Sequence, residues 1–481
     1  MILVPELLSQ PFSMLYTIED KPPWPTSIVL GFQQYLTMFG STVAIPLLLQ
    51  SHLRASNAEL ALLISTMFLV SGISTLLQTT FGSRLPIVQG GTFSFLGPAI
   101  AICGMASLAD AGFEVRMQHV QGAVIAGAFF EMLVGFGGLM GRILKFITPV
   151  TIAPTIALIG LALFKFGAPV AGEYWGIGGL TILLLILFSQ YFRKAHPLLN
   201  LFPILLGLVS AWLVATILSV AGIFELGHPA YVSFEAVKEA PWVQVPSPFQ
   251  WGMPIFGVAA IVGMLSGYIA SMIESTGDYF AAARMSEAPT PNAKTINRGI
   301  GFEGLGCLLA GIFGTGNGTT SYSENIGAIG LTRVGSRRVI QAAGFLMLGF
   351  AVFGKFGALF VSIPSPVVGG MYCVMFAMVT GVGLSNLQFV DLNSSRNLFI
   401  IGFALFSGLS LPEYVGAHGE AILGLFPESL QWFAGIIITI GSSGMAVGAF
   451  LALILDNTIP GTDAERGIES FLSQTKPSSD S

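Results

Sequence analysis

The stretch TGNGTTSYSENIGAIGLTRVGSRR (Thr315–Arg338) places a carboxylate and an amide in a Gly- and Ser-rich break within membrane-type sequence. The apolar run GFEGLGCLLAGIF (Gly301–Phe313) precedes this break, and a second apolar run over residues 339–360 follows it. Irregular backbone at membrane depth is tolerated only where it is buried in protein or lines a cavity. We therefore predict that a spanning helix is interrupted at Gly314–Gly318 and restarts near Glu324, whose carboxylate faces a buried polar site.

The composition is that of a protein of the lipid bilayer. Of the 481 residues, 53% are hydrophobic and only 9% are charged, whereas a soluble surface needs about a quarter of charged residues. The three cysteines, an odd number, lie in apolar segments and permit no complete disulfide framework. Residues 1–26 lack the basic start, apolar core and cleavage site of a signal peptide. We predict an all-α polytopic membrane protein with a cytoplasmic N-terminal tail.

Apolar windows of about twenty residues mark membrane spans. We predict fourteen spans, at residues 27–49, 59–80, 86–104, 118–140, 148–168, 175–192, 201–222, 254–283, 299–314, 315–332, 338–360, 363–384, 397–412 and 432–455. With the N-terminus inside, fifteen of the 20 basic residues fall on the cytoplasmic side, as the positive-inside rule requires. Both termini are therefore predicted to be cytoplasmic, in a multi-pass protein of the plasma or inner membrane.

The chain has the organisation of a duplication. We predict an N-terminal tail, a first seven-span repeat, an extracellular linker, a second seven-span repeat and a C-terminal tail, at residues 1–26, 27–222, 223–253, 254–455 and 456–481. An odd number of spans in each half forces the two halves to insert with opposite topology. The run PVTIAPTIALIGLALF from Pro149 can also be laid over PVVGGMYCVMFAMVTG from Pro366.

The third span of each repeat, the third and tenth of the chain, is broken. LPIVQGGTFSFLGP (Leu85–Pro98), which contains Gln89, and TTSYSENIGAIGLT (Thr319–Thr332) each predict a short extended piece followed by a half-helix. The start of a half-helix leaves about four backbone N–H groups without intrahelical partners, together with the positive end of the helix dipole. Two such ends that face each other make a polar pocket with donors on both sides, which suits a ligand rich in carbonyl acceptors.

Five carboxylic residues lie well inside the predicted spans: Glu131, Glu274, Asp278, Glu303 and Glu324. An intramembrane charge costs at least about 2.5 kcal/mol unless it faces a cavity or a partner, so a functional role is the default hypothesis. Glu274 and Asp278 are four residues apart and share a helical face, which Ser271 and Ser275 keep polar. Glu324 completes this candidate site. Alternatively, Asp278 hydrogen-bonds a neighbouring half-helix end and only fixes its geometry.

Several chemistries are excluded by what the spans lack. All five histidines fall in loops or at span ends, so carboxylates must carry any protons. Gly354–Lys355 is followed by Phe356, so no phosphate loop supplies ATP drive. The spans offer no metal-ligand cluster and no nucleophile–base pair, so we predict neither an enzyme nor a cofactor, and no nucleic-acid partner. Glu131 and Glu303 lack the context of the other carboxylates and are expected to support packing or to lie near a span end.

Several motifs resemble the nucleobase/ascorbate transporter family, which includes xanthine, uric acid and uracil permeases. SENIGAIGLTR (Ser323–Arg333) is similar to the family signature, whose fixed positions here are Glu324, Asn325, Gly327, Thr332 and Arg333. GFQQYLTMFG, QGGTFSF, ESTGDY, VGSRR and LDNTIPGTDAERG extend the likeness over essentially the whole chain. The resemblance implies fourteen spans as two inverted sevens, with a core domain (spans 1–4 and 8–11) that moves against a gate domain (spans 5–7 and 12–14).

The resemblance also implies roles for individual residues. Glu274 and Glu324 would hydrogen-bond a base, Phe93 would stack on its ring, and Tyr322 and Ser323 would lie beside it. Asn325 would belong to the substrate-binding residues and would also hold the site in place. Seven residues would provide structural support or proton coupling: Glu274, Asp278, Gln33, Gln34, Gln89, Thr332 and Arg333.

Three positions bear on the choice of substrate. Gln33–Gln34 stands where much of the family has Gln-His, and Asp278 stands where uracil permeases carry His. The second difference resembles the purine carriers. Ascorbate carriers typically have Pro at the position of Glu324, so the likeness favours a base over ascorbate.

These observations predict a secondary active symporter that imports a purine or pyrimidine base with H⁺. A base presents N–H donors and C=O acceptors in one plane, which carboxylates, half-helix amides and the ring of Phe93 match. The alternatives are a Na⁺-coupled nucleobase or ascorbate carrier, and a channel or anion exchanger of the same architecture. Two glutamates in the site would repel an anion. The resemblance also implies a homodimer through the gate domains.

Overall fold

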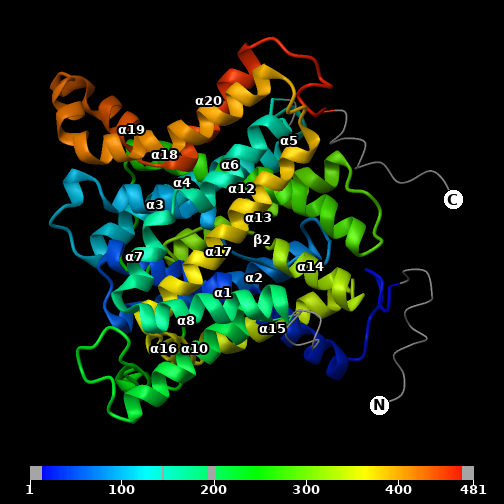
Figure 1. Ribbon diagram of the computed structural model, residues 1–481. Helices are drawn as coiled ribbons and strands as arrows, with labels where there is room; N and C mark the ends of the chain where they lie inside the picture. The colour runs from blue at the N-terminus through cyan, green and yellow to red at the C-terminus, as the bar shows by residue number, and fades with distance from the viewer. Residues whose placement is uncertain (1–13, 144–145, 193–201, 469–481) are drawn as a thin grey trace.

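The protein is helical, and its computed structural model describes residues 14–143, 146–192 and 202–468 (Figure 1). The main elements before residue 223 are α1 (Trp24–Leu53), α2 (Asn57–Thr80), β1 (Gln89–Gly91), η2 (Phe93–Phe95), α3 (Leu96–Cys103), α4 (Phe113–Phe136), α5 (Met140–Ile143), α6 (Pro149–Leu161), α7 (Ala168–Ala171), α8 (Trp175–Ile186) and α10 (Pro203–Val220). The later ones are α11 (Glu235–Glu239), α12 (Val258–Met285), α13 (Ala293–Phe313), β2 (Thr319–Ser321), α14 (Ser323–Thr332), α15 (Arg337–Val352), α16 (Gly354–Val361), α17 (Ser365–Ser385), α18 (Ser395–Gly424), α19 (Gln431–Gly441) and α20 (Gly444–Thr458). The outer parts of the predicted tails, residues 1–13 and 469–481, lie outside the described chain.

Local sequence signals set the helix ends. α2 begins with a capping box, in which the Ser56 hydroxyl accepts from the Glu59 N–H and the Glu59 carboxylate accepts from the Ser56 N–H. Proline occupies the first turn of α1, α6, α10 and α17, where its missing N–H leaves no hydrogen bond unmade. α13 ends at Gly314, whose φ of 73° favours glycine. The predicted interruption at Gly314 is therefore confirmed.

Helix length gives a smaller number of spans than the sequence predicts. Within the described residues, eight helices are long and apolar enough to cross a membrane, or up to nine if the bent pair Glu428–Gly441 and Gly444–Thr458 is one span. The predicted number of fourteen is not established by this criterion, because several predicted spans are interrupted. The eight-residue α3 and the ten-residue α14 cover about 12–15 Å each, which is less than the hydrocarbon core of about 30 Å.

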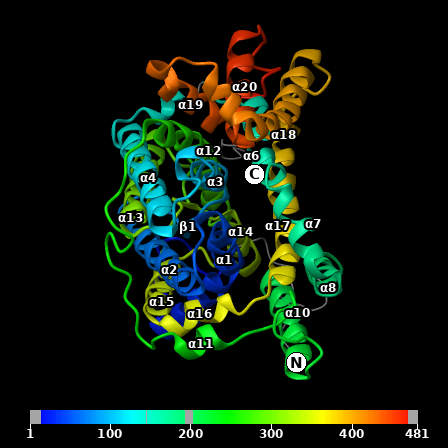
Figure 2. The same ribbon diagram turned by 90° about the vertical axis from the view of Figure 1, so that its left-hand side faces the viewer.

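The helices form two groups that lie side by side in Figure 2. The first group contains α1–α4 and α12–α15, and the second contains α6–α8, α10, α17, α18 and α20. Packing in the first group follows one pattern twice: α4 packs on α13 and α12, and α15 packs on α2 and α1. In the second group, α6 packs against α17, α18 and α20, while α17 packs against α6, α8 and α10. Each group thus combines helices from both halves of the chain.

Two short strands join the broken spans. β1 pairs with β2 antiparallel, in the register Gln89↔Ser321, Gly90↔Thr320 and Gly91↔Thr319. Because the strands are antiparallel, the chain leaves them at opposite ends, so α3 and α14 run away from the pair in opposite senses. A side chain at Gly90 would meet the Tyr322 ring, since a Cβ there would lie 2.5 Å from a ring carbon. The extended pieces predicted at both breaks are confirmed.

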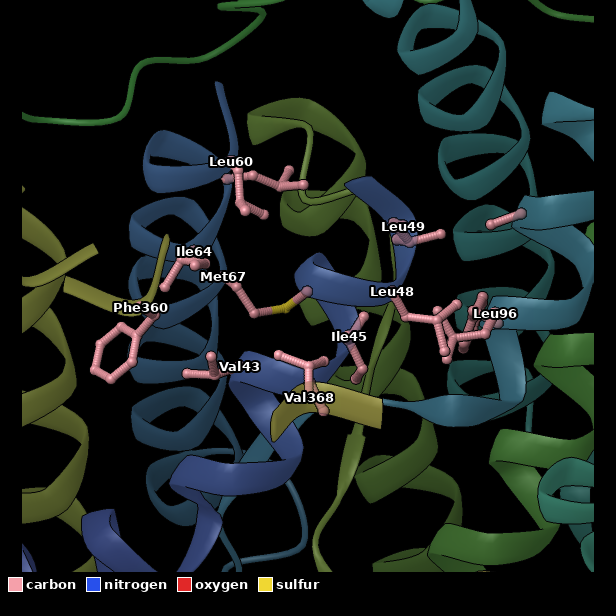
Figure 3. Close-up of a cluster of buried hydrophobic side chains, with 14 of the residues drawn as sticks. Val43, Ile45, Leu48, Leu49, Leu60, Ile64, Met67, Leu96, Phe360 and Val368 are labelled. Atoms are coloured by element: carbon pink, nitrogen blue, oxygen red, sulfur yellow. The ribbon is translucent and has the colours of Figure 1, made fainter. Parts of the chain in front are cut away.

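A buried apolar cluster holds α1 in place beside the strands. Figure 3 shows Val43, Ile45 and Leu48 of α1 against Met67 of α2 and Leu96 of α3. Lipid is as apolar as these side chains, so close van der Waals packing rather than escape from water stabilises such contacts within a membrane. The cluster fixes the middle of α1, where the hydroxyl groups of Ser41 and Thr42 reach the site described below.

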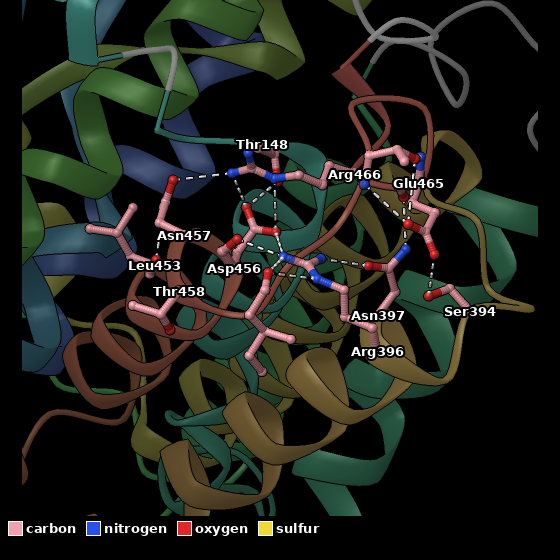
Figure 4. A network of polar contacts seen from close by, with 12 residues as sticks. Thr148, Ser394, Arg396, Asn397, Leu453, Asp456, Asn457, Thr458, Glu465 and Arg466 are labelled. Carbon is pink, nitrogen blue, oxygen red and sulfur yellow. Dashed lines mark hydrogen bonds and ion pairs between the residues drawn. The ribbon is translucent and has the colours of Figure 1, made fainter.

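A buried ionic network ties the second group together at one end (Figure 4). The Asp456 carboxylate of α20 is fully buried and accepts from Arg396 Nη2 at 3.0 Å, Arg466 Nη2 at 2.9 Å and Thr148 Oγ1 at 2.8 Å. Arg396 opens α18, Thr148 precedes α6, and Arg466 belongs to the segment after α20. Beside the network, the Thr462 N–H and the Ser394 hydroxyl lower the pKa of Glu465. The network therefore binds α6, α18 and α20 to the C-terminal segment.

Candidate substrate cavity

A cavity of about 280 Å³ lies between the two helix groups. The two broken spans and α12 form its first side, with Gly91, Thr92, Phe93, Glu274, Thr320, Tyr322, Ser323 and Glu324. The helices α6, α10 and α17 form its second side, with Ile156, Ile159, Ile204, Met375, Met378, Val379 and Val382. Five of the six residues predicted to bind substrate line this cavity: Phe93, Glu274, Tyr322, Ser323 and Glu324.

Glu274 and Glu324 are each held by one serine hydroxyl. Ser94 Oγ donates to Glu274 Oε2 at 3.2 Å, and Ser41 Oγ donates to Glu324 Oε1 at 3.0 Å. Both carboxylates are half-buried, and Glu324 lies in the first turn of α14, where the helix dipole favours a negative charge. Each serine engages one oxygen of its carboxylate. The other oxygen of each carboxylate is a potential acceptor for a ligand N–H group.

Asp278 lies one helical turn beyond Glu274 and binds the start of α14. Its Oδ2 accepts from Ser321 Oγ at 2.6 Å, and its Oδ1 accepts from Ser323 Oγ at 2.9 Å. Asp278 is buried and does not line the central cavity. This geometry favours the alternative in which Asp278 hydrogen-bonds a half-helix end and fixes its position.

Two aromatic residues connect the broken spans with their surroundings. Phe93 lines the cavity and packs edge-to-face on Phe376 of α17, with ring centroids 5.6 Å apart and an interplanar angle of 89°. The Tyr322 hydroxyl donates to the Gly91 carbonyl at 2.7 Å and lies 3.0 Å from Thr42 Oγ1. Phe93 can therefore cover a planar ligand, and Tyr322 locks one break against the other.

Asn325 takes a supporting position rather than a ligand-binding one. Its side chain is buried, and Nδ2 donates to the Gln34 carbonyl at 2.7 Å and to Gln34 Oε1 at 2.8 Å. This pair fastens α14 to α1. Because Asn325 lies next to Glu324 in the helix, its side chain points about 100° away from that of Glu324, which is why sequence adjacency did not bring it into the cavity.

The remaining predicted support residues lie away from the cavity. Thr332 and Arg333 end α14 on the far side from Glu324, and Arg333 adopts a left-handed φ of 58°. Gln33 precedes Gln34 on α1, and its carbonyl accepts from the Thr37 hydroxyl. Gln89 is buried in β1, where its backbone N–H donates to Thr75 Oγ1 at 2.9 Å. These residues position elements of the site without lining it.

The serines of α12 have partners that the sequence does not indicate. Ser271 and Ser275, which the sequence predicts to keep the face of Glu274 and Asp278 polar, donate to Glu303 of α13 at 3.0 Å and 2.6 Å. Ser275 also contacts Ser321, which binds Asp278. Glu303 is buried at mid-helix and therefore does not lie near a span end. Sequence reasoning also missed Ser41 and Ser94; hydroxyls at helix positions opposite intramembrane carboxylates were the available signal.

The cavity connects with larger spaces on one side. A vestibule of about 820 Å³ shares Glu274 and Ser323 with it and reaches Arg284, and a second space of about 490 Å³ shares Glu324. Arg284 lies on the predicted cytoplasmic side. In the opposite direction, a pocket of about 150 Å³ shares only Phe93 and Ile159 with the cavity, so these two side chains separate them.

Broken helices that meet at a cavity between two helix groups are features of a membrane transporter, and comparison with known proteins agrees. A protein-family model described as "Permease family" (Xan_ur_permease) matches residues 25–416. Solute carrier family 23 member 2 of Mus musculus is 46% identical, with 95% of this chain and 76% of that protein covered. Nucleobase-ascorbate transporter 1 of Arabidopsis thaliana is 39% identical, with 92% and 89% covered. This chain belongs to the nucleobase/ascorbate transporter family, and it is a transporter rather than an enzyme.

A solved structure shares the fold at low sequence identity. The transmembrane domain of the cyanobacterial bicarbonate transporter BicA superposes with a TM-score of 0.59 at 14% identity, covering 83% of this chain and 99% of that one. At this identity the likeness concerns the fold alone. The predicted resemblance to the nucleobase/ascorbate family is thus confirmed at the level of sequence, and the predicted helical membrane fold at the level of structure.

Proposed function

We propose that this chain is a secondary active symporter that imports a nucleobase together with H⁺, the base being a purine such as xanthine, uric acid or guanine, or uracil. The observation that carries the proposal is the pairing of Glu274 and Glu324 on one side of a single cavity. Each carboxylate keeps one oxygen bound to a serine and one for a ligand. The ring N–H groups of a base are donors of the required kind.

The rest of the cavity supplies complementary contacts for such a ring. The first-turn N–H groups of α14 lack intrahelical acceptors and can donate to ring carbonyls. Phe93 offers a flat face, and stacking of a base on an aromatic ring is tolerant of base identity. A sugar would need donors and acceptors spread in three dimensions instead. The proton resides on Glu274, where neutralising one of two neighbouring carboxylates lowers the cost of moving the loaded site through the membrane.

Ascorbate is the second candidate substrate, because relatives at 38–39% identity carry the name nucleobase-ascorbate transporter. Ascorbate is an anion at neutral pH, and two carboxylates in the cavity would repel it unless a cation accompanied it. The same argument counts against a channel or anion exchanger, although the bicarbonate transporter shares the fold. Coupling to Na⁺ in place of H⁺ is the corresponding alternative for a base.

In the proposed transport movement, the first helix group, with its broken spans, moves against the second. In these terms the core domain comprises spans 1–4 and 8–11, the gate domain comprises spans 5–7 and 12–14, and two gate domains meet in a homodimer. Fourteen spans in two inverted repeats put both termini in the cytoplasm. In a Cys-free background, Arg337→Cys should then be modified only from the cytoplasmic side and Lys238→Cys only from outside. Modification of both from one face would contradict this topology.

Counterflow in proteoliposomes tests the function. Vesicles loaded with unlabelled xanthine should take up labelled xanthine transiently, and uracil, uric acid or guanine inside should replace xanthine as the exchanging partner if it is also a substrate. Empty vesicles and vesicles without protein are the controls. Counterflow of labelled ascorbate or bicarbonate, with none of any base, would contradict the proposal.

A further inference from the structure

A second carboxylate site lies behind the substrate cavity. Glu303 of α13 is only 1% exposed. Its Oε1 accepts from Ser271 Oγ at 3.0 Å, and its Oε2 accepts from Ser275 Oγ at 2.6 Å and from the Tyr279 hydroxyl at 3.3 Å. Thr320 of β2 donates to it more weakly, at 3.4 Å. Neither Glu303 nor its serine partners line the central cavity.

A continuous chain of hydroxyls connects Glu303 with Asp278. Ser275 Oγ lies 2.9 Å from Ser321 Oγ, which in turn lies 2.6 Å from Asp278 Oδ2. Asp278 lines the vestibule of about 820 Å³ on the predicted cytoplasmic side. The single hydroxyl proton of Ser321 therefore has two acceptors within reach, Asp278 and Ser275. Such an arrangement can pass a proton between a carboxylate that meets the vestibule and one in the interior.

Glu131 of α4 provides an independent sign of a bound proton. It is fully buried, and no N–H or O–H group in the described part of the chain donates to its oxygens, towards which only the weak Cys307 thiol donor is turned. It faces Glu303 and the Cys307 thiol of α13, and Tyr268 and Tyr279 of α12 are the other titratable groups turned towards it. Two neighbouring carboxyl groups in a low-dielectric interior cannot both ionise without a large cost. The pair Glu131–Glu303 therefore holds at least one proton.

We propose that Glu131 and Glu303 form a proton-binding site separate from the substrate cavity, filled and emptied through Ser275, Ser321 and Asp278. This inference rests on the proposed H⁺ symport and adds a second proton to the one on Glu274. In the inward transfer, Asp278 gives its proton to the Ser321 oxygen, Ser321 gives its own to Ser275, and Ser275 gives its own to Glu303. Each serine ends with one proton, and one negative charge moves from Glu303 to Asp278.

The serines of α12 offer a matched pair of variants. Ser271 and Ser275 both donate to Glu303, but only the Ser275 hydroxyl also contacts Ser321. Ser275→Ala interrupts the chain of hydroxyls between Glu303 and Asp278, whereas Ser271→Ala leaves it intact. Ser275→Thr restores a hydroxyl at the interrupted position. Xanthine counterflow, which needs no net proton movement, reports that each variant is folded and binds substrate.

The measurement is the limiting accumulation of labelled xanthine against an imposed pH step in proteoliposomes whose membrane potential is clamped to zero. Each proton carried with a neutral base raises the limiting accumulation about tenfold per pH unit. We expect about a hundredfold per pH unit for the wild type and for Ser271→Ala, and about tenfold for Ser275→Ala and Glu303→Gln, with counterflow retained in all. Ser275→Thr should recover the wild-type value.

Equal accumulation by the wild type and Ser275→Ala, with counterflow intact in both, would overturn the second proton site and leave the proposed function standing. Accumulation that follows Na⁺ and ignores a proton ionophore would overturn both the second proton site and the proposed coupling to H⁺. Absence of base counterflow from the wild type would contradict the proposed function itself, so the two failures are distinguishable.

Discussion

The two sides of the central cavity differ completely in chemistry. The side built from the broken spans and α12 carries every polar group, including both carboxylates, whereas the side built from α6, α10 and α17 consists of Ile, Met and Val alone. Under the proposed function, directional hydrogen bonds would tie a ligand to the first side. The second side offers only dispersion contacts, which change little as one surface slides past another. Under the proposed function, the first helix group therefore carries the specificity, and the second supplies an apolar surface past which the first can move.

The apolar side keeps its shape through ionic contacts placed elsewhere. Of its helices, α6 meets α18 and α20 of the same helix group at the buried Asp456, at the end of the bundle rather than in the cavity. The polar side is instead held at the cavity itself, through pairs such as Asn325 with Gln34. Substitutions in the two regions should therefore change different properties, stability in one and ligand selectivity in the other.

The largest effect is expected at Asp456. Asp456→Ala leaves Arg396 and Arg466 without their shared buried carboxylate, which should lower the free energy of unfolding by about 3–5 kcal/mol. Thermal unfolding of the detergent-solubilised protein measures this change. Asp463→Ala, at an exposed position of the same segment, is the control and should alter stability by no more than about 0.5 kcal/mol. Equal melting temperatures for the two variants would refute the structural role of the network.

Next in size is the loss of a cavity carboxylate. Glu324→Ala removes an acceptor from a desolvated site, which should cost about 1.5–3 kcal/mol of binding free energy, or about 10- to 150-fold in affinity. Glu324→Gln should instead change the ranking among bases, because an amide both donates and accepts. Competition against labelled xanthine measures both. Wild-type affinities for xanthine and uracil in Glu324→Ala would remove Glu324 from the site.

Removal of the aromatic ring should weaken the binding of all bases by a similar factor. Phe93→Ala loses ring stacking worth about 1–3 kcal/mol per base, and it also loses the edge-to-face contact with Phe376. The same competition assay, run with several bases, reports the factor for each. Phe93→Tyr keeps the ring and is the control. A loss confined to one base would show that Phe93 recognises ring substituents rather than the ring face.

The smallest effect is expected on the apolar side. Met378→Leu conserves volume, and volume-conserving exchanges usually cost less than about 1.5 kcal/mol. It removes no hydrogen bond, so the ranking among bases should stay that of the wild type. Affinities for xanthine, uric acid and uracil in this variant test that expectation. A reordering of the bases by Met378→Leu would show that the apolar side shares in recognition of the base.

The sequence was informative where chemistry is local. Glycines and hydroxyl residues around Glu324 are incompatible with an uninterrupted apolar helix, so both breaks and their extended pieces could be predicted. Five of the six proposed ligand residues line the cavity; Glu274 and Glu324 were predicted as intramembrane carboxylates, whereas the roles of Phe93, Tyr322 and Ser323 came from the family resemblance. The number of spans could not be derived in this way, because half-helices such as α14 are too short to count by length.

Contacts between distant segments account for the rest. Ser41 reaches Glu324 across 283 residues of sequence, and Asn325 finds Gln34 across 291. The sequence predicts only packing support or a position near a span end for Glu303, because its partners lie on α12 and nothing in its own neighbourhood indicates them. The rotation of Ser271 and Ser275 towards α13 likewise depends on which helix packs beside α12, a property of the assembled fold.

In the proposed symport, a carboxylate of the polar side couples the base to a proton, and Glu274→Gln examines this coupling without removing the side chain. The amide imitates the protonated side chain, so the unloaded site can return without a proton. Proteoliposomes containing Glu274→Gln should retain at least part of their labelled xanthine counterflow, while accumulation driven by an inward proton gradient should fall about tenfold per pH unit, which is the share of the proton on Glu274. Gradient-driven accumulation at the wild-type level in Glu274→Gln would show that Glu274 does not carry the coupled proton.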